Sequence, residues 1–283
     1  MGRPVRIACL QTRPQASFEK ALGEALGLAG AAVDYGADLL ALPEYCGGFR
    51  TEGGAIASPA APEAEHPVLL GLAEFACTRG VWILVGSVAV PGPEGKILNR
   101  GVTIGPDGVT LARYDKIHMF DIQLSETEVY RESARVAPGG SAALVEAAGA
   151  KIGHTICYDL RFPHLYRDLA QAGAEILSVP AAFTKKTGEV HWHVLNRARA
   201  IENGAFVVSP CAVGPIPGGG ESYGHSLIVD PWGAVLADGG DRPGIVTATI
   251  DLDAVAAARA KIPSLTHDRA FAPAASAPAR DVA

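Results

Sequence analysis

The sequence predicts an α/β fold in which mixed β-sheets pack against outer helices. Short apolar runs typical of buried strands are interspersed with longer segments of helical periodicity along the 283 residues. Both helical crossovers and hairpins connect the strands, which indicates parallel and antiparallel pairing in the same sheets. The length suits one large domain, predicted over residues 1–270, with a flexible Ala/Pro-rich tail at 271–283.

Periodicity and turn residues define the predicted elements. Helical spacing of alanine and leucine predicts a helix over 17–33, Gly80 is expected to end another, and a Gly-Pro-Asp-Gly turn predicts a hairpin over 102–114. Residues 214–220 are expected to form a mobile loop. Further strands are predicted at 5–10, 38–42, 81–90, 151–156, 174–179, 205–211, 226–230 and 245–250, and helices at 68–78, after 157 through 172, 189–202 and 251–261.

Composition restricts the possible functions. A hydrophobic content of 48% argues against disorder, and a net charge of −6 argues against nucleic acid or an anionic membrane as partner. The chain enters a strand directly at its start and has no apolar run of transmembrane length, so a soluble, cytoplasmic protein is expected. Its five cysteines lack Cys-x-x-Cys spacing, as expected for reduced thiols. Cys9 and Cys211 are interpreted as strand core residues, Cys77 as a helix core residue, and Cys46 as core or loop packing near the site.

Cys157 ends an apolar strand and precedes a polar turn within residues 151–163. A thiol at the carboxyl edge of a sheet is exposed by the sharp turn, where backbone N–H groups face a bound molecule. The start of the following helix is expected to lower the pKa of this thiol. Such a position suits nucleophilic catalysis through a thioester; the alternative is a small core residue.

Two other predicted strands end near ionisable residues. Glu44 closes the apolar run that begins at Leu39, and Lys116 follows the hairpin strand. Because strand ends converge on one crevice in open α/β layers, these side chains are expected to meet Cys157. A partly desolvated glutamate can serve as base, and a lysine beside the backbone N–H of Tyr158 would stabilise an oxyanion. Replacing Glu44 by Gln or Lys116 by Ala is expected to remove activity without loss of stability.

The segments around these positions resemble the nitrilase superfamily of carbon–nitrogen hydrolases, in its glutamate–lysine–cysteine form. The resemblance extends from about residue 5 to 270 and is greatest to the Nit branch, which includes omega-amidases and deaminated-glutathione amidases. The matching segments are 42–45, 114–121, 156–163, 180–183 with 187–188, 191–192, 197–203, 223–226 and 230–233.

The resemblance implies a four-layer αββα sandwich and cysteine-dependent hydrolysis of an amide C–N bond. The substrate would be a small, carboxylate-bearing amide, hydrolysed through a thioester with release of ammonia or an amine. A nitrilase or an N-carbamoyl amide hydrolase with the same Glu–Lys–Cys site is the alternative. The resemblance also implies a second glutamate beside the lysine, which matches Glu132, and a homodimer or higher oligomer. No cofactor is implied.

Four further residues are expected to bind substrate or the oxyanion. The N–H of Tyr158 would hold the oxyanion with Lys116, and Phe183 and Thr184 would line the substrate site. Arg161 would bind a substrate carboxylate through its planar guanidinium, as an arginine in this motif of the Nit branch. The alternative for Arg161 is an ion pair with Asp159 or Glu202.

Rival interpretations have less support from the sequence. A cysteine–histidine hydrolase needs a histidine base, and none of the eight histidines lies in a recognisable signature. His191 and His193 are two apart on a predicted helix, so they point about 200° apart and cannot hold one metal ion together. His193 is expected to be exposed and His191 to be a structural hydrogen-bonding residue, with Trp192 in the core. A non-enzymatic binding module would not explain the complete set of catalytic side-chain types.

Overall fold

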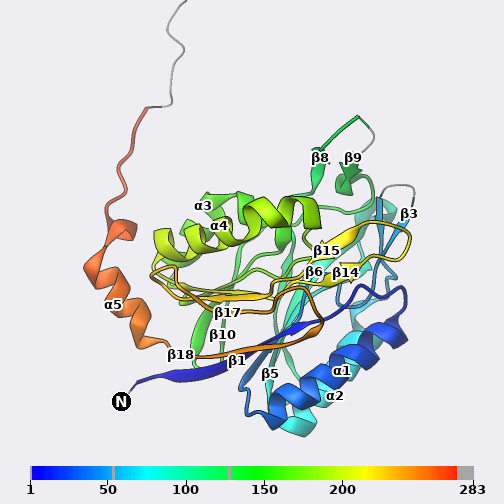
Figure 1. Ribbon diagram of the computed structural model, residues 1–283, viewed down its shortest axis with the longest axis horizontal. Coiled ribbons are helices and arrows are strands. Elements are labelled where there is room, and N and C mark those ends of the chain that lie inside the picture. Colours follow the sequence, from blue (N-terminus) through cyan, green and yellow to red (C-terminus); the bar gives the residue numbers. More distant parts are fainter. Residues whose placement is uncertain (1, 53–54, 127–128, 273–283) are drawn as a thin grey trace, which may run out of the picture.

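The computed structural model of the protein describes residues 2–52, 55–126 and 129–272. Two six-stranded sheets lie face to face, and a pair of helices covers each outer face, which gives four layers (Figure 1). The predicted αββα sandwich is therefore confirmed. No helix in these ranges is long and apolar enough to cross a membrane.

Each sheet combines parallel and antiparallel neighbours. In spatial order, the first sheet contains β18 (Gly244–Asp251), β1 (Pro4–Gln11), β2 (Leu39–Ala41), β5 (Trp82–Pro91), β6 (Ile97–Ile104) and β7 (Thr110–Asp115). The second contains β10 (Ala143–Ala147), β11 (Ala150–His154), β12 (Ile176–Ser178), β13 (Phe206–Ser209), β16 (Leu227–Val229) and β17 (Val235–Asp238). Small hairpins pair β3 (Arg50–Glu52) with β4 (Ala55–Ala57), β8 (Asp121–Gln123) with β9 (Val129–Arg131), and β14 (Val213–Pro215) with β15 (Glu221–Tyr223).

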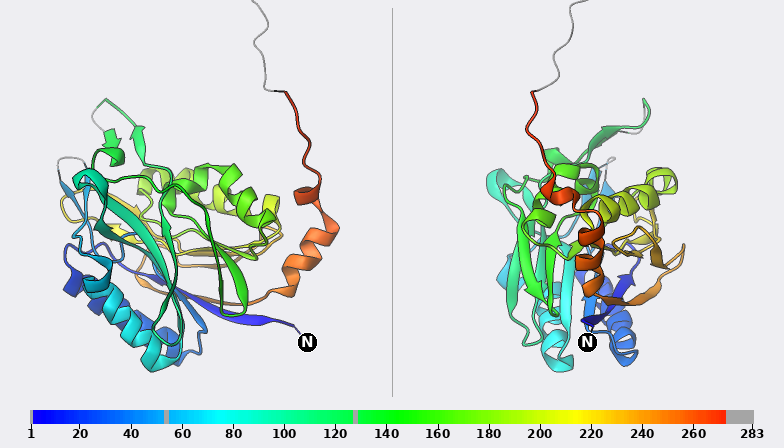
Figure 2. Two further views of the ribbon diagram at one scale, coloured as in Figure 1. Left: turned by 180° about the vertical axis from the view of Figure 1, so that it is seen from behind. Right: turned by 90° about the vertical axis from the view of Figure 1, so that its left-hand side faces the viewer.

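Two helices cover the outer face of each sheet. Helices α1 (Phe18–Asp34) and α2 (Pro67–Arg79) cover the first sheet, and α3 (Pro163–Gln171) and α4 (Lys185–Asn203) cover the second. Helix α5 (Asp253–Lys261) lies beside the N-terminal strand, at the opposite end from the β3 and β8–β9 hairpins (Figures 1 and 2). The described part of the chain also contains the short 3₁₀ helices η1 (Glu63–Glu65), η2 (Pro93–Gly95), η3 (Glu132–Ala134), η4 (Cys157–Arg161) and η5 (Ser264–Thr266).

Strand alternation explains why the layers stack. In β1, Ile7 and Cys9 face the second sheet, while Ala8 and Leu10 face the helices α1 and α2. The same alternation in the second sheet places Phe206 between the sheets. Successive side chains of a strand point to opposite faces, so a strand buried on both sides is apolar at every position. Three apolar cores, one between the sheets and one under each helix pair, thus fix the sandwich.

Most predicted strands and helices are present, but the segment after Cys157 is not one helix. The chain forms the 3₁₀ helix η4, leaves helical geometry at Phe162, and only then begins α3 at Pro163. Proline disfavours helical geometry in the residue before it, which explains the interruption. Helix α4 also begins at Lys185, four residues before the predicted start at Glu189.

Three smaller expectations have different outcomes. Cys77 is exposed on α2, because its helical neighbour Ala76 takes the buried position. Gly214 and Pro215 belong to β14, and residues 216–220 form the turn between β14 and β15, so the loop is shorter than expected and its mobility stays a prediction. Positions 273–283 of the predicted tail lie outside the described residues.

Candidate active site

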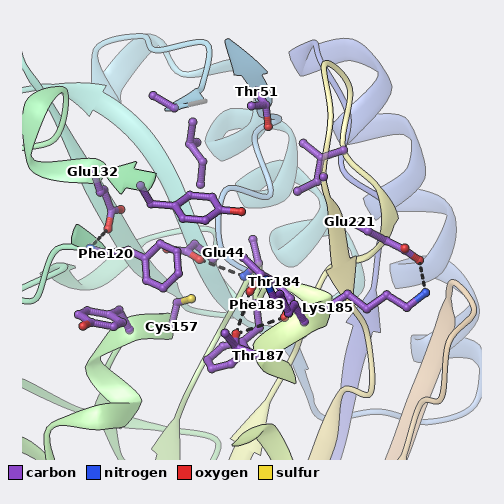
Figure 3. A pocket seen from close by; sticks show the side chains of 18 of the residues that line it. Glu44, Thr51, Phe120, Glu132, Cys157, Phe183, Thr184, Lys185, Thr187 and Glu221 are labelled. Atoms are coloured by element: carbon purple, nitrogen blue, oxygen red, sulfur yellow. Dashed lines mark hydrogen bonds and ion pairs between the residues drawn. The ribbon is translucent and has the colours of Figure 1, made fainter. Parts of the chain in front are cut away.

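The cavity that contains Cys157 has a volume of about 500 Å³ and opens between the ends of the two sheets. Glu44, Lys116 and Glu132 lie in its wall with Cys157. Figure 3 shows Glu44, Glu132 and Cys157 in this wall. The hairpins β3–β4, β8–β9 and β14–β15 contribute further lining residues, including Ile56, Val129 and Ile216. The strand ends therefore form the base of the cavity and the hairpins form its mouth.

A bulge in β5 positions Glu44. The pairing of β5 with β6 shifts register between Val85 and Val88, and the hydroxyl of Ser87 in this bulge accepts the N–H of Tyr45 over 2.8 Å. A Cβ atom on Gly86 would lie 2.0 Å from the carbonyl oxygen of Leu42, so only glycine permits this approach. The bulge thus holds the segment after β2, and Glu44 with it, against the sheet.

Three donors fix the carboxylate of Glu44. Its Oε1 accepts hydrogen bonds of 2.9 Å from the Asn99 amide and from Nζ of Lys116, and its Oε2 accepts one of 2.9 Å from the backbone N–H of Ala182. The side chain is only 3% exposed. Charge-assisted hydrogen bonds of this kind are short and directional, so the carboxylate has one preferred orientation beside Cys157.

Lys116 lies between two carboxylates. Its Nζ is 2.9 Å from Oε1 of Glu44 and 2.9 and 3.0 Å from the two oxygens of Glu132. Burial lowers the pKa of Lys116, but the negative charges of Glu132 and Glu44 outweigh burial and raise it well above its usual value. The side chain therefore remains a cation between the two carboxylates.

Two further hydrogen bonds fix the carboxylate of Glu132 beside Lys116. Its Oε2 accepts the backbone N–H of Phe120 over 2.6 Å, and its Oε1 accepts the hydroxyl of Tyr45 over 3.3 Å. Glu132 begins η3 directly after the β8–β9 hairpin. The position inferred by resemblance is thus in direct contact with Lys116.

Cys157 occupies a strained turn. Its φ of +50° lies in the left-handed region, and its N–H donates to the carbonyl of Pro180 over 2.8 Å. Burial, together with the negative charge of Glu44, raises the pKa of this thiol well above its usual value despite Lys116. The expectation of a lowered pKa is therefore wrong. The five-residue 3₁₀ turn lowers the pKa of the thiol by less than burial raises it. The resting residue is a neutral thiol.

A hydrogen-bonded cluster centred on Asp159 supports the turn. One carboxylate oxygen accepts the Ile156 N–H over 2.8 Å and the Tyr114 hydroxyl over 2.7 Å, and the other contacts the backbone and ring nitrogens of His118. Asp159 is fully buried. The cluster ties the cysteine turn of the second sheet to the segment that carries Lys116. Sequence reasoning missed this role, and also Asn99 and Tyr45, because their partners are distant in the chain.

The predicted substrate-binding residues separate into two groups. Tyr158, Phe183 and Thr184 line the cavity, whereas Arg161 is not among its described lining residues. The guanidinium of Arg161 instead lies 5.8 and 5.5 Å from the ring centroids of Tyr158 and Phe183. Its alternative ion-pair partners are engaged elsewhere, Asp159 in the cluster above and Glu202 with Arg199. The predicted carboxylate-binding role of Arg161 therefore has no support from its position.

The expected roles of the α4 histidines hold only in part: His191 is a hydrogen-bonding residue but is exposed, and His193 is half-buried. His191 is exposed, with its ring nitrogen 3.4 Å from Arg161, whereas Nε2 of His193 is 2.9 Å from Asp238. Trp192 is fully buried, as predicted. Neither histidine lines the cavity among its described residues, so a histidine base for Cys157 gains no support.

The fold and this arrangement define a hydrolase of nitrilase-like architecture with a buried glutamate–lysine–cysteine set. The chain belongs to the carbon–nitrogen hydrolase family, whose model matches residues 6–260. It falls in the Nit branch of the nitrilase superfamily, and its class is that of an amidase.

Among curated relatives, the chain is 40% identical to the deaminated glutathione amidase of Synechocystis sp. (strain PCC 6803 / GT-S), over 94% of this chain and 98% of the relative. It is 34% identical to omega-amidase NIT2 of Mus musculus, over 94% and 95% of the two chains.

Solved structures show the same likeness. The C. elegans NitFhit protein matches with a TM-score of 0.82 and 31% identity, over 95% of this chain and 66% of that one. Nit3 of Saccharomyces cerevisiae matches with a TM-score of 0.79 and 26% identity, over 92% and 94%. A Glu-to-Gln variant of the amidase from Nesterenkonia sp. AN1, with a TM-score of 0.75 and 25% identity over 94% of both chains, carries the acetamide moiety of fluoroacetamide on its active-site cysteine.

Proposed function

We propose that the protein hydrolyses the amide C–N bond of a small, carboxylate-bearing substrate through a thioester on Cys157. The observation that carries this proposal is the contact of Glu44 with Lys116, both buried, in the cavity that contains the thiol. No single element of the set would suffice, because a neutral thiol needs a base and a developing oxyanion needs fixed positive charge.

In the first half of the reaction, Glu44 accepts the proton of Cys157 as sulfur attacks the amide carbon. The Lys116 ammonium and the N–H of Tyr158 stabilise the resulting oxyanion. A neutral resting thiol fits this order of events, since Glu44 then removes the thiol proton while sulfur attacks the bound substrate. The protonated Glu44 next gives its proton to the leaving nitrogen, and the C–N bond breaks to release ammonia or an amine.

In the second half, Glu44 removes a proton from a water molecule that attacks the thioester carbon. The same donors hold the second oxyanion, the C–S bond breaks, and the proton on Glu44 returns to sulfur. The carboxylate product leaves, and the thiol is regenerated. Glu132 acts throughout by positioning Lys116, and Asp159 by positioning the cysteine turn.

The first turn of α4 supports a preference for an anionic substrate. Thr184, Lys185, Lys186 and Thr187 all line the cavity, so the positive end of this 19-residue helix faces the substrate space. The hydroxyl of the N-cap residue Thr184 contacts the hydroxyl of Thr187 over 2.8 Å and caps no backbone N–H of the first turn. Nζ of Lys185 is paired with Oε1 of Glu221 over 2.9 Å in the same cavity wall. The backbone N–H groups of this turn and the positive end of the helix dipole therefore offer the site for a substrate carboxylate. Phe183 and Ile56 would contact the apolar part of the acyl chain.

The acyl-enzyme is the first test. Brief exposure to substrate followed by denaturing mass spectrometry should show an acyl adduct on the Cys157 peptide, absent in Cys157→Ala. The panel contains small omega-amides, deaminated glutathione, carbamoyl amino acids and nitriles, with released ammonia as readout. An adduct on Cys46 or Cys211 would contradict the assignment, and turnover of nitriles alone would favour the nitrilase alternative.

Substrate charge is the second test. An acidic amide should have a higher kcat/KM than its methyl ester or neutral homologue, because only the carboxylate benefits from the α4 terminus. The double variant Lys185→Gln/Lys186→Gln should raise KM for the acidic amide and leave the neutral homologue unchanged. Arg161→Gln is the matched control, since it removes a cation outside the described cavity lining. Equal kcat/KM for both substrates in the unaltered protein would refute the preference.

We also propose a homodimer formed through the outer helices of the second sheet. Val190, Val194 and Ile201 on α4 are 63%, 66% and 51% exposed, and Trp232 nearby in the chain fold is 58% exposed. Trp232 adjoins Gly233, whose carbonyl accepts Nε of Arg197 on α4 over 2.8 Å. Such residues suit an interface that is apolar at its centre. Light scattering at micromolar concentration should give twice the monomer mass. The five free cysteines fit a reducing compartment, and we propose the cytoplasm.

A further inference from the structure

We propose that His193, His225 and Asp238 form a binding site for a borderline divalent transition-metal ion such as Zn²⁺. None of the three is among the described residues that line the Cys157 cavity, so the site is separate from the proposed chemistry and does not depend on it. The ligand atoms of these side chains all lie within 4.8 Å of one another.

The three side chains come from three different elements. His193 lies on α4, His225 follows β15, and Asp238 ends β17, the edge strand of the second sheet (Figure 1). Nε2 of His193 is 2.9 Å from Oδ2 of Asp238, and Nδ1 of His225 is 2.8 Å from Oδ1. The Asp238 carboxylate is thus hydrogen-bonded to one ring nitrogen of each histidine, which places the two nitrogens close together.

The position of His225 is fixed by its backbone. Its φ of +51° lies in the left-handed region, which is strained for a residue with a Cβ atom. Its N–H donates to the Gly240 carbonyl over 2.7 Å, and its own carbonyl accepts the indole N–H of Trp192 over 2.7 Å. The strained backbone therefore aims the imidazole at Asp238, and this preorganisation suits a ligand site.

The carboxylate is oriented in the same way. Oδ1 of Asp238 accepts the N–H of Gly240 over 2.9 Å, so the loop that holds His225 also holds the third ligand. Metal-ligating side chains commonly have such outer hydrogen bonds, which fix their orientation.

The donor set selects the class of ion. Two imidazole nitrogens with one carboxylate oxygen suit Zn²⁺, Co²⁺, Ni²⁺ or Cu²⁺, whereas Mg²⁺ and Ca²⁺ prefer oxygen ligands alone. Ligand atoms around a tetrahedral Zn²⁺ are about 3.4 Å apart, so modest rotation of the two rings closes the site. The side chains are 33%, 27% and 35% exposed, which leaves the remaining position open to water.

Metal binding would exchange two hydrogen bonds for coordination bonds. Each imidazole would present the nitrogen that faces Asp238 without its proton, which moves to the other ring nitrogen or to solvent. The ion would then join α4, the segment after β15 and the edge strand β17. The proposed metal site is connected to the cavity wall through Trp192. Its indole N–H is bonded to the carbonyl of His225, and its ring packs on Phe183 with ring centroids 4.9 Å apart.

The test measures metal affinity on the full chain after EDTA treatment. Zn²⁺ is titrated in competition with a chromophoric chelator, in a Cys157→Ala background so that the buried thiol does not contribute. We expect one Zn²⁺ bound per chain, unaffected by excess Mg²⁺, and an increase in Tm on binding. His193→Ala and Asp238→Asn should each weaken binding by at least about tenfold, the lower end of what loss of even an outer hydrogen-bond partner costs a metal site.

Two controls separate coordination from folding and from thiol binding. His267→Ala removes an exposed histidine outside the cluster and should leave the affinity unchanged. His193→Gln can still donate to Asp238 but is a poor ligand, so it should keep the metal-free Tm and lose affinity. Co²⁺ should give visible bands without thiolate charge-transfer absorption. Equal Zn²⁺ affinity in His193→Ala and its parent, or a thiolate spectrum that persists, would overturn the proposal.

Discussion

The backbone N–H of Ala182 donates a hydrogen bond of 2.9 Å to Oε2 of Glu44, although 138 positions separate the two residues. Ala182 follows β12 in the second sheet, and Glu44 follows β2 in the first. The bond therefore joins the ends of the two sheets at the candidate active site. The position of the carboxylate therefore depends on the packing of the whole sandwich.

Glu44→Gln should lower kcat by about 10²–10⁴, the range that a positioned general base contributes. The amide cannot satisfy all three donors around Glu44, so the free energy of unfolding should also fall, by about 1–3 kcal/mol. This differs from the sequence-based expectation of unchanged stability. Steady-state ammonia release and urea unfolding measure the two effects. Glu146→Gln, an exposed position on β10, serves as control and should change neither. Retention of more than about a tenth of the activity would contradict the role of Glu44 as base.

Lys116→Met should abolish activity and reduce stability by about 3–5 kcal/mol, because it leaves two buried carboxylates without their cation. Here too the structure corrects the expectation of unchanged stability. The double variant Lys116→Met/Glu132→Gln removes one of those charges. It should recover part of the lost stability without recovering activity. Urea unfolding of the single and double variants decides the point. A double variant no more stable than the single would show that burial of unpaired charge is not the cause.

Cys157→Gly should be at least as stable as Cys157→Ala, although both are inactive. A left-handed backbone costs a residue with a Cβ atom about 1–2 kcal/mol, and glycine avoids that cost. Cys9 on β1 is the matched control, since it is equally buried but lies in a strand. There, Gly should be less stable than Ala by about 0.5–1 kcal/mol. Thermal unfolding of the four variants tests the reversal, and the same order at both positions would argue against strain at Cys157.

Stability should fall as the pH rises above about 9, because several thiols are buried. Burial raises the pKa of Cys46 and of Cys211 to about 12 from a usual value of 9.0. Between those values the unfolded chain loses these protons while the folded chain keeps them, so each thiol favours unfolding by up to about 1.4 kcal/mol per pH unit. Urea unfolding at several pH values in this window measures the slope. Cys46→Ala/Cys211→Ala should reduce the slope, and an unchanged slope would assign the effect to other groups.

The sequence was sufficient for the parts of the site that depend on local pattern. Glu44 and Cys157 each follow an apolar strand and Lys116 follows the hairpin strand β7, and strand ends of this kind converge on one crevice, so their meeting could be predicted. The pattern of strands and helices predicted mixed sheets packed against outer helices, whereas the four-layer αββα arrangement was implied by the resemblance to the family. Resemblance to the family added Glu132, whose surroundings carry no such pattern.

Tertiary structure alone decided the contacts between distant segments. Asn99 and Ala182 hold Glu44 across long intervals of sequence, and His193 meets Asp238 and His225 rather than His191. Burial also determined the state of the thiol, since desolvation exceeds the effect of a short 3₁₀ turn. Sequence periodicity reports which face of one element is apolar, whereas hydrogen bonds, desolvation and charge pairing depend on which other elements that face meets. That is why the identities of the candidate catalytic residues were predictable and their protonation, supports and neighbours were not.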